Sequence, residues 1–71
     1  MNKEFSYEVI EHIAVIGNYG TGTKEINIIS FNGAEPKYDI RNWAIDGCKK
    51  VMGKGITLTD DEFEALRQAI R

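Results

Sequence analysis

Glycine-containing turns divide this sequence into short segments, and no other feature constrains its fold as much. Three glycines fall within residues 17–22, and further turns are expected at 32–36, 46–47 and 53–55. Glycine adopts positive φ angles without steric cost, so such clusters mark places where a chain reverses. The segments between the turns are rich in β-branched and aromatic residues, which favours strands.

The alternation of side chains predicts four strands. They are expected at residues 5–16, 23–31, 37–44 and 56–58. The first changes phase at Ile10, which indicates a bulge or two half-strands. The fourth is short because a tight basic bend is expected at residues 53–55 before it.

One helix is predicted at the C-terminal end. Thr59 followed by Glu62 is a capping box, and the acidic residues around it favour the positive end of the helix dipole. Phe63, Leu66 and Ile70 form one apolar stripe. We therefore expect an α+β domain of the order β-β-β-β-α, one domain that spans residues 1–71.

The size of the chain suggests a partner. At 71 residues and 8.0 kDa, it lies where a single hydrophobic core is barely sufficient. The apolar stripe of the helix is a self-complementary surface that suits a two-fold homodimer.

Several classes of protein are excluded by composition. One cysteine, Cys48, and one histidine, His12, provide neither an internal disulfide framework nor a closed four-ligand zinc site. Nothing in the sequence orients these two residues as a catalytic pair, so we expect no enzyme, no metal and no cofactor. Residues 17–24 depart from the phosphate-loop pattern, and we expect a hairpin turn there. Without a signal peptide or a membrane-spanning run, a cytoplasmic location that includes the nucleoid is expected.

The net charge conceals a basic middle. The whole chain carries −2 and has a pI near 5.3, which argues against a nucleic-acid partner. Residues 24–54, however, carry six basic side chains against four acidic ones, a net charge of +2. Because fields are screened over about 8 to 10 Å in physiological salt, a ligand responds to the local patch.

Basic and aromatic residues recur together in this middle segment. The set comprises Lys24, Phe31, Lys37, Arg41, Trp43 and Lys54. In the third strand, Arg41 and Trp43 fall on one face and Tyr38 and Ile40 on the other. Cations that follow phosphates, with rings that stack on bases, are what single-stranded nucleic acid requires. The alternative interpretation, that the two rings are core residues and the lysines a solvated face, stays open.

Three segments occur in a specific order: Asp39-Ile40-Arg41-Asn42-Trp43, then residues 53–59 (GKGITLT), then the capped helix through Leu66. Together they resemble the transcriptional positive cofactor 4 (PC4) family. Residues 24–27 and 36–41 are most similar to its small bacterial, YdbC-like members. The resemblance extends from Phe5 to Ile70.

The resemblance implies a curved four-stranded antiparallel sheet and a helix-mediated homodimer, with single-stranded DNA on the outer faces of the sheets. It places the dimer interface at Phe63, Leu66 and Ile70. It places DNA contacts at Lys24, Phe31, Arg41, Trp43 and Lys54. In the second turn, Asn32 and Lys37 stand where the family has paired lysines, and we add Lys49 and Lys50 as second-rank candidates.

We therefore predict a PC4-like, single-stranded DNA-binding protein that acts with the transcription, replication or repair machinery. Little sequence preference is expected, because no helix that would carry base-reading side chains into a groove is evident. RNA is a variant within the same class. The alternative is a protein-interaction module that uses the sheet or its edge without binding nucleic acid.

Overall fold

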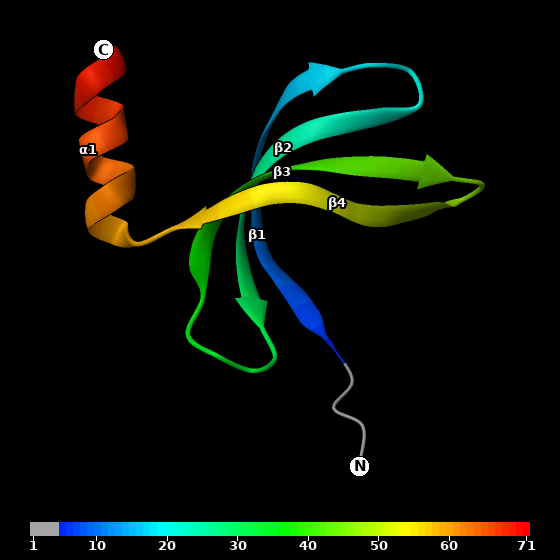
Figure 1. Cartoon of the computed structure of the whole chain (residues 1–71), viewed down its shortest axis with the longest axis horizontal. Coiled ribbons are helices and arrows are strands. Elements are labelled where there is room, and N and C mark those ends of the chain that lie inside the picture. The colour runs from blue at the N-terminus through cyan, green and yellow to red at the C-terminus, as the bar shows by residue number, and fades with distance from the viewer. Residues whose placement is uncertain (1–4) are drawn as a thin grey trace.

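A computed structural model describes residues 5–71 as a four-stranded antiparallel sheet followed by one helix (Figure 1). The elements are β1 (Tyr7–Asn18), β2 (Gly22–Phe31), β3 (Lys37–Asp46), β4 (Lys49–Leu58) and α1 (Asp60–Ile70). The strands pair in the order β1-β2-β3-β4, so each lies beside its predecessor. The predicted α+β order is confirmed, and the first four residues of the predicted domain lie outside the described part.

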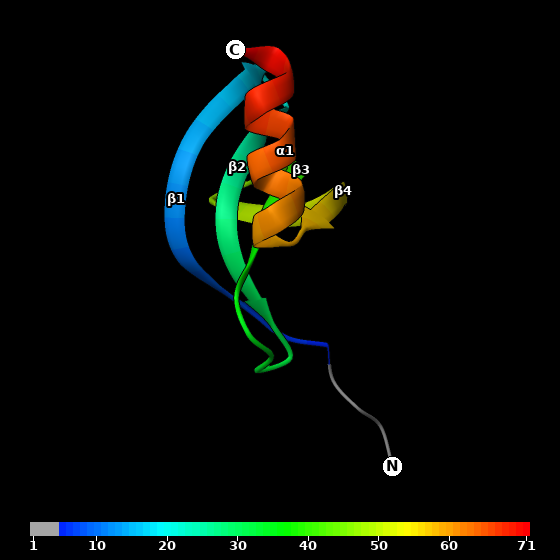
Figure 2. The ribbon, with the colours of Figure 1, turned by 90° about the vertical axis from the view of Figure 1, so that its left-hand side faces the viewer.

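The strand β1 is long and bent. Its register with β2 shifts three times and skips Ile10, Ile13 and Ile16. Each bulge adds an unpaired residue to one strand and increases the local twist. In Figure 2, β1 and β2 accordingly follow two arcs that curve in the same sense. The phase change predicted at Ile10 is therefore the first of three bulges.

The turn between β2 and β3 uses the residues that the sequence singled out. Asn32 and Gly33 both have positive φ, 53° and 76°, and the amide of Ala34 donates to the carbonyl oxygen of Phe31 at 2.8 Å. The backbone amide of Ser6 donates to Oδ1 of Asn32 at 2.9 Å, and the amide of Asn32 donates back to the carbonyl of Ser6 at 2.8 Å. This turn is thus fastened to the residues that lead into β1.

The bend predicted at residues 53–55 is wrong, and so is the short fourth strand. β4 runs without a break from Lys49 to Leu58, and its register with β3 shifts between Arg41 and Trp43. A Cβ added at Gly55 would lie 1.9 Å from the Cβ of Arg41. Glycine is present because β3 passes too close for a side chain, and the sequence signal of close approach resembles that of a turn.

The sheet curls toward one face, which we call the concave face. Its side chains come from Tyr7, Val9 and His12 of β1, Glu25, Asn27, Ile29 and Phe31 of β2, Asp39, Arg41 and Trp43 of β3, and Lys50 and Met52 of β4. Side chains of both edge strands line one cavity on this face. Within residues 5–71, the buried apolar side chains are Ile29 and Trp43, and both belong to it.

The helix packs on the opposite, convex face. The ring of Phe63 stacks on Tyr38 of β3, with centroids 3.9 Å apart and planes 6° apart. The predicted capping box is confirmed, because Thr59 accepts from the amide of Glu62 at 3.1 Å and the Glu62 side chain accepts from the amide of Thr59 at 2.9 Å. Beyond Phe63 the apolar stripe is uncovered. Among the described residues, no helix is long and apolar enough to cross a membrane.

Candidate nucleic-acid interface

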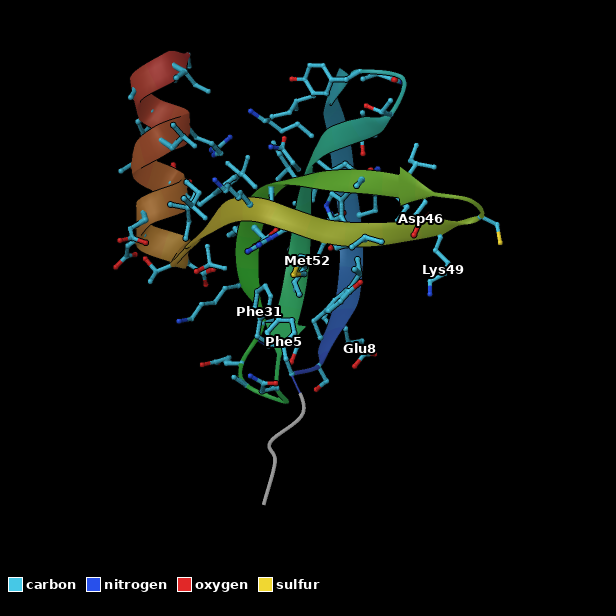
Figure 3. The ribbon with its side chains drawn as sticks, turned by 45° about the vertical axis from the view of Figure 1, so that its right-hand side comes forward. Phe5, Glu8, Phe31, Asp46, Lys49 and Met52 are labelled. Atoms are coloured by element: carbon cyan, nitrogen blue, oxygen red, sulfur yellow. The ribbon has the colours of Figure 1, made fainter. Side chains whose placement is uncertain are left out.

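Four aromatic rings form a chain of contacts on and beside the concave face. Phe5 lies 6.0 Å from Phe31 and 6.2 Å from Tyr7, and Tyr7 lies 5.7 Å from Trp43, measured between ring centroids. Figure 3 shows Phe5 beside Phe31 at one end of the sheet. Phe5 is 63% exposed, whereas Trp43 is 4% exposed. The chain of rings therefore runs from an open surface into the centre of the sheet.

Two cations lie over these rings. The guanidinium carbon of Arg41 lies 5.5 Å from the centroid of Phe31, and Nζ of Lys50 lies 5.9 Å from that of Trp43. Both distances are within the range of cation–π attraction. The structure thus brings together the alternation of positive charge and aromatic surface that the sequence predicted for this side of β3.

The guanidinium of Arg41 is held in place by a buried carboxylate. Nε and Nη2 donate to the two oxygens of Asp39 at 2.7 Å each, and Nη1 donates to the carbonyl oxygen of Gly53 at 2.9 Å. Asp39 is completely buried. Three of the five N–H groups of the guanidinium are engaged in these bonds, so within residues 5–71 one N–H group on each terminal nitrogen has no partner and can donate to a ligand. The donors on the two terminal nitrogens, the fork of the guanidinium, can bind two oxygens of one phosphate.

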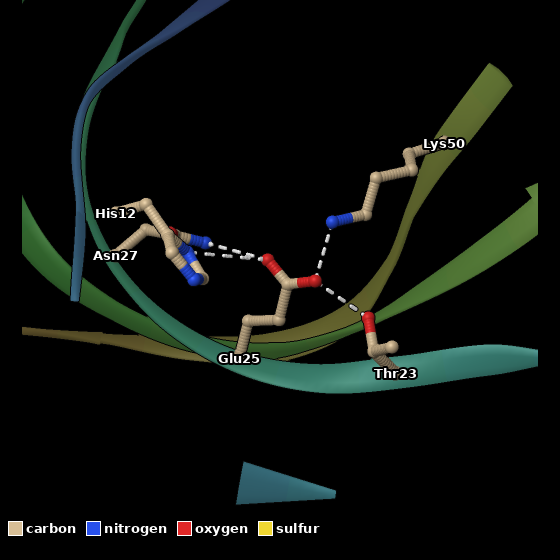
Figure 4. A network of polar contacts seen from close by, with 5 residues as sticks. All are labelled: His12, Thr23, Glu25, Asn27 and Lys50. Atoms are coloured by element: carbon tan, nitrogen blue, oxygen red, sulfur yellow. Dashed lines mark hydrogen bonds and ion pairs between the residues drawn. The ribbon is translucent and has the colours of Figure 1, made fainter. Parts of the chain in front are cut away.

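A second carboxylate on this face, Glu25, is the centre of a polar network (Figure 4). One of its oxygens, Oε2, accepts from the Thr23 hydroxyl at 2.7 Å and from the ammonium of Lys50. Asn27 donates to Oε1 at 3.4 Å, and Nδ1 of His12 donates to the amide oxygen of Asn27 at 2.7 Å. Register explains the assembly, since β2 places Thr23, Glu25 and Asn27 on one face and the curl of the sheet brings β1 and β4 to them.

Glu25 is ionised at neutral pH. Its burial opposes ionisation, but hydrogen bonds from Lys50, Thr23 and Asn27 outweigh that effect, and the pKa of Glu25 lies below its usual value. Lys50 therefore neutralises a charge that would repel a polyanion at this point of the concave face.

Two predicted phosphate-binding lysines, Lys24 and Lys54, lie outside the concave face. Lys24 pairs in register with Asn42 and so faces away from Trp43. Lys24 and Lys54 line one depression with Ile40 and Ile56 of the convex face, and Arg41 also contributes to its lining. The structure therefore brings these two lysines together beside Arg41, although both lie outside the cavity that Trp43 and Lys50 line.

The remaining predicted contact residues are placed as follows. Lys37 pairs with Ile29 of β2 and is exposed on the concave side. Lys49 is exposed near the β3–β4 turn, opposite Asp46 (Figure 3). Asn32 uses its side-chain oxygen to hold Ser6. Phe31 is partly exposed. The burial of Trp43 agrees with the core interpretation that the sequence left open, so base stacking on Trp43 stays a prediction.

The sequence analysis missed the buried polar residues beneath the cations. Glu25 and Asn27 alternate with Ile26 and Ile28 along β2, and they share the parity of Phe31. That alternation was a usable signal: it indicates a polar face on β2 beside the Arg41 face of β3. The identity of their partners depended on the curvature of the sheet.

Comparisons with known proteins agree with this architecture. The family model described as Transcriptional Coactivator p15 (PC4) matches residues 20–69. A protein of Treponema pallidum (strain Nichols), which bears the name "Uncharacterized protein", is 44% identical over 71 residues. That alignment covers 99% of this chain and 81% of the relative.

Proposed function

The chain belongs to the Transcriptional Coactivator p15 (PC4) family, and from this premise we propose that it binds single-stranded DNA through the concave face. Family membership supports a nucleic-acid-binding, non-catalytic role. The concave face points away from the helix, so in a helix-mediated dimer it would be an outer face. Its cations and exposed rings are the chemistry that a single strand requires.

One observation carries this proposal: the fork of Arg41 is fixed beside the ring of Phe31 by the buried Asp39. A strand laid on this face meets a positioned phosphate donor next to a partly exposed aromatic surface. Phe5 and Tyr7 extend that surface. Since stacking accepts any base, this part of the interface binds without regard to sequence.

We also propose that two copies associate through α1. The side chains of Ile56, Leu66 and Ile70 are 56%, 37% and 74% exposed, and all lie on the convex face or the helix. Burial of apolar surface contributes about 25 cal/mol per Å², so a second copy of the same stripe would stabilise a fold with a small core. A dimer also carries two concave faces, which increases avidity where one strand reaches both.

The test is a titration of the protein into a fluorescent oligothymidylate of about 20 nucleotides, at two salt concentrations, with the matching duplex as control. We expect preference for the single strand and an affinity that falls with salt by a log–log slope of about −0.7 per phosphate contact. Absence of binding at low salt would contradict the proposal and would favour a protein-interaction module. Equal binding of RNA would place the protein among general single-strand binders.

The cellular role that we propose is in transcription, replication or repair, wherever single strands are exposed at the nucleoid. Contacts with a polymerase or another protein of that machinery are compatible with the free edge of β4. A pull-down with single-stranded DNA that recovers such machinery only in the presence of this protein would support this assignment.

A further inference from the structure

A cavity of about 350 Å³ opens on the concave face between the two edge strands. Its lining combines the apolar side chains of Tyr7, Val9, Val15 and Trp43 with the polar side chains of His12, Glu25, Asn27 and Lys50. The volume lies in the range of sites for small molecules, roughly 300 to 1,000 Å³. A flat ring with apolar faces and a polar edge fits this mixed lining, and nucleobases are such rings.

The two oxygens of Glu25 differ in how well the protein satisfies them. Oε2 accepts hydrogen bonds from Thr23 and Lys50, but for Oε1 the described residues offer only Asn27 at 3.4 Å and Nδ1 of His12 at 3.6 Å. An N–H group normally approaches an oxygen to 2.7–3.2 Å. Because Glu25 is 3% exposed, a hydrogen bond from a closer donor would contribute more binding free energy here than at the surface. Oε1 therefore has capacity for another N–H group.

A donor stands beside this acceptor. The ammonium of Lys50 has three N–H groups, and its side chain is half exposed above Glu25. His12 fixes the amide of Asn27, so that its NH₂ end is turned toward Glu25. The polar side chains of the cavity thus present an acceptor next to a donor, held by a network that is already in place.

We propose that this cavity receives one nucleobase of the bound strand and prefers guanine. Guanine carries two adjacent N–H donors, at N1 and N2, which can converge on Oε1 of Glu25, beside the carbonyl acceptor O6, which can accept from Lys50. Thymine, adenine and cytosine each bring only one N–H donor to Oε1 along the same edge. The inference rests on the proposed function, since the base arrives as part of a single strand. At this one position of the bound strand, a preference for guanine replaces the expected lack of sequence preference.

The first experiment uses the unaltered protein and four oligothymidylates of about 20 nucleotides whose central base is T, A, C or G. We expect the oligonucleotide with G to bind roughly 5- to 100-fold more tightly than the other three. Inosine at that position, which lacks the 2-amino group, should lose most of the gain. The analogue 7-deazaguanine keeps N1, N2 and O6 and should retain it.

The outcomes separate this inference from the proposed function. Equal affinity for all four oligonucleotides would overturn the guanine site and leave single-strand binding intact. If none of the four binds at low salt, the proposed function itself fails. A preference that inosine retains in full would also contradict the assignment, because the 2-amino donor would then have no partner.

A pair of variants tests the role of the carboxylate. Glu25→Gln should remove the preference for guanine, seen as equal affinities for the oligonucleotides with T, A, C or G at the centre. Glu11→Gln removes the same charge from an exposed side chain outside the cavity and should keep the preference. A folded Glu25→Gln protein that still prefers guanine would refute the site. If circular dichroism shows that this variant does not fold, the base series on the unaltered protein decides.

Discussion

Replacing Asp39 by asparagine tests two opposite effects of this carboxylate on DNA binding. It positions the guanidinium of Arg41, which favours binding, and its negative charge repels DNA. The carboxylate is completely buried and accepts two hydrogen bonds of 2.7 Å from Arg41. Asparagine keeps the size of the side chain and removes one negative charge from a face that we propose binds a polyanion. Charge alone predicts tighter DNA binding. Loss of positioning predicts weaker binding, because the amide nitrogen would face the guanidinium and at least one of the two bonds would break.

The magnitudes favour weaker binding. A phosphate bound on the far side of the guanidinium would lie about 8 Å from Asp39, where the repulsion is about 2 kcal/mol at an effective dielectric constant of about 20, and screening by salt over about 8 Å reduces it to about 1 kcal/mol. A hydrogen bond to a charged group is worth about 1.5 to 3 kcal/mol, and without it the fork of Arg41 must be ordered when DNA binds. We therefore expect Asp39→Asn to weaken binding by about 0.5 to 2 kcal/mol, roughly 2- to 30-fold in Kd.

The assay is fluorescence anisotropy with an oligothymidylate of about 20 nucleotides at one salt concentration, with the fold checked by circular dichroism. Asp46→Asn is the matched control, because it removes the same charge from the exposed end of β3. That control should bind as tightly as the unaltered protein or slightly more tightly. A folded Asp39→Asn protein that binds as tightly as Asp46→Asn would refute the positioning argument. Arg41→Lys keeps the charge but loses the fork, so it should weaken binding as well.

Three further results are expected. Leu66→Asp should convert a dimer into a monomer, seen as a halved mass in light scattering, because it places a charge in the proposed interface; an unchanged mass would exclude α1 as that interface. Gly55→Ala should cost at least about 1 to 3 kcal/mol in urea unfolding, since its Cβ would overlap Arg41; an unchanged midpoint would contradict the close approach. The pKa of Glu25 lies below its unfolded value, so its stabilisation is present above about pH 4.5 and is lost as pH falls through the folded pKa. Glu25→Gln should therefore flatten the acid side of the stability profile, and an identical profile would refute this.

Much of the fold was predictable because its signals are local. Thr59 and Glu62 lie three residues apart, so the start of α1 follows from neighbouring residues alone. The bulge at Ile10 appeared as a change of phase within one strand. The parity of β3 likewise placed Arg41 and Trp43 on one face. Each of these features needs only the geometry of a single element.

Glycine shows where local reasoning fails. Gly33 lies in a turn with positive φ, and Gly55 lies inside β4, pressed against β3. Both positions require a residue without a side chain. At Gly33 the reason is the backbone conformation, and at Gly55 it is the contact with β3. A single sequence does not separate the two, and the predicted bend at 53–55 was wrong for this reason.

The sequence by itself determined the order of the elements, the capped helix and the mixture of cations and rings in the middle of the chain. Only the tertiary structure decided which of those residues meet. Glu25 and Lys50 are 25 positions apart and come together because the twist of the sheet curls β4 toward β2. The same curl buries Trp43, whereas the register of β2 with β3 leaves Lys24 on the convex face. Curvature is a property of the whole sheet, since it accumulates from the twist between every pair of strands, and no single segment encodes it.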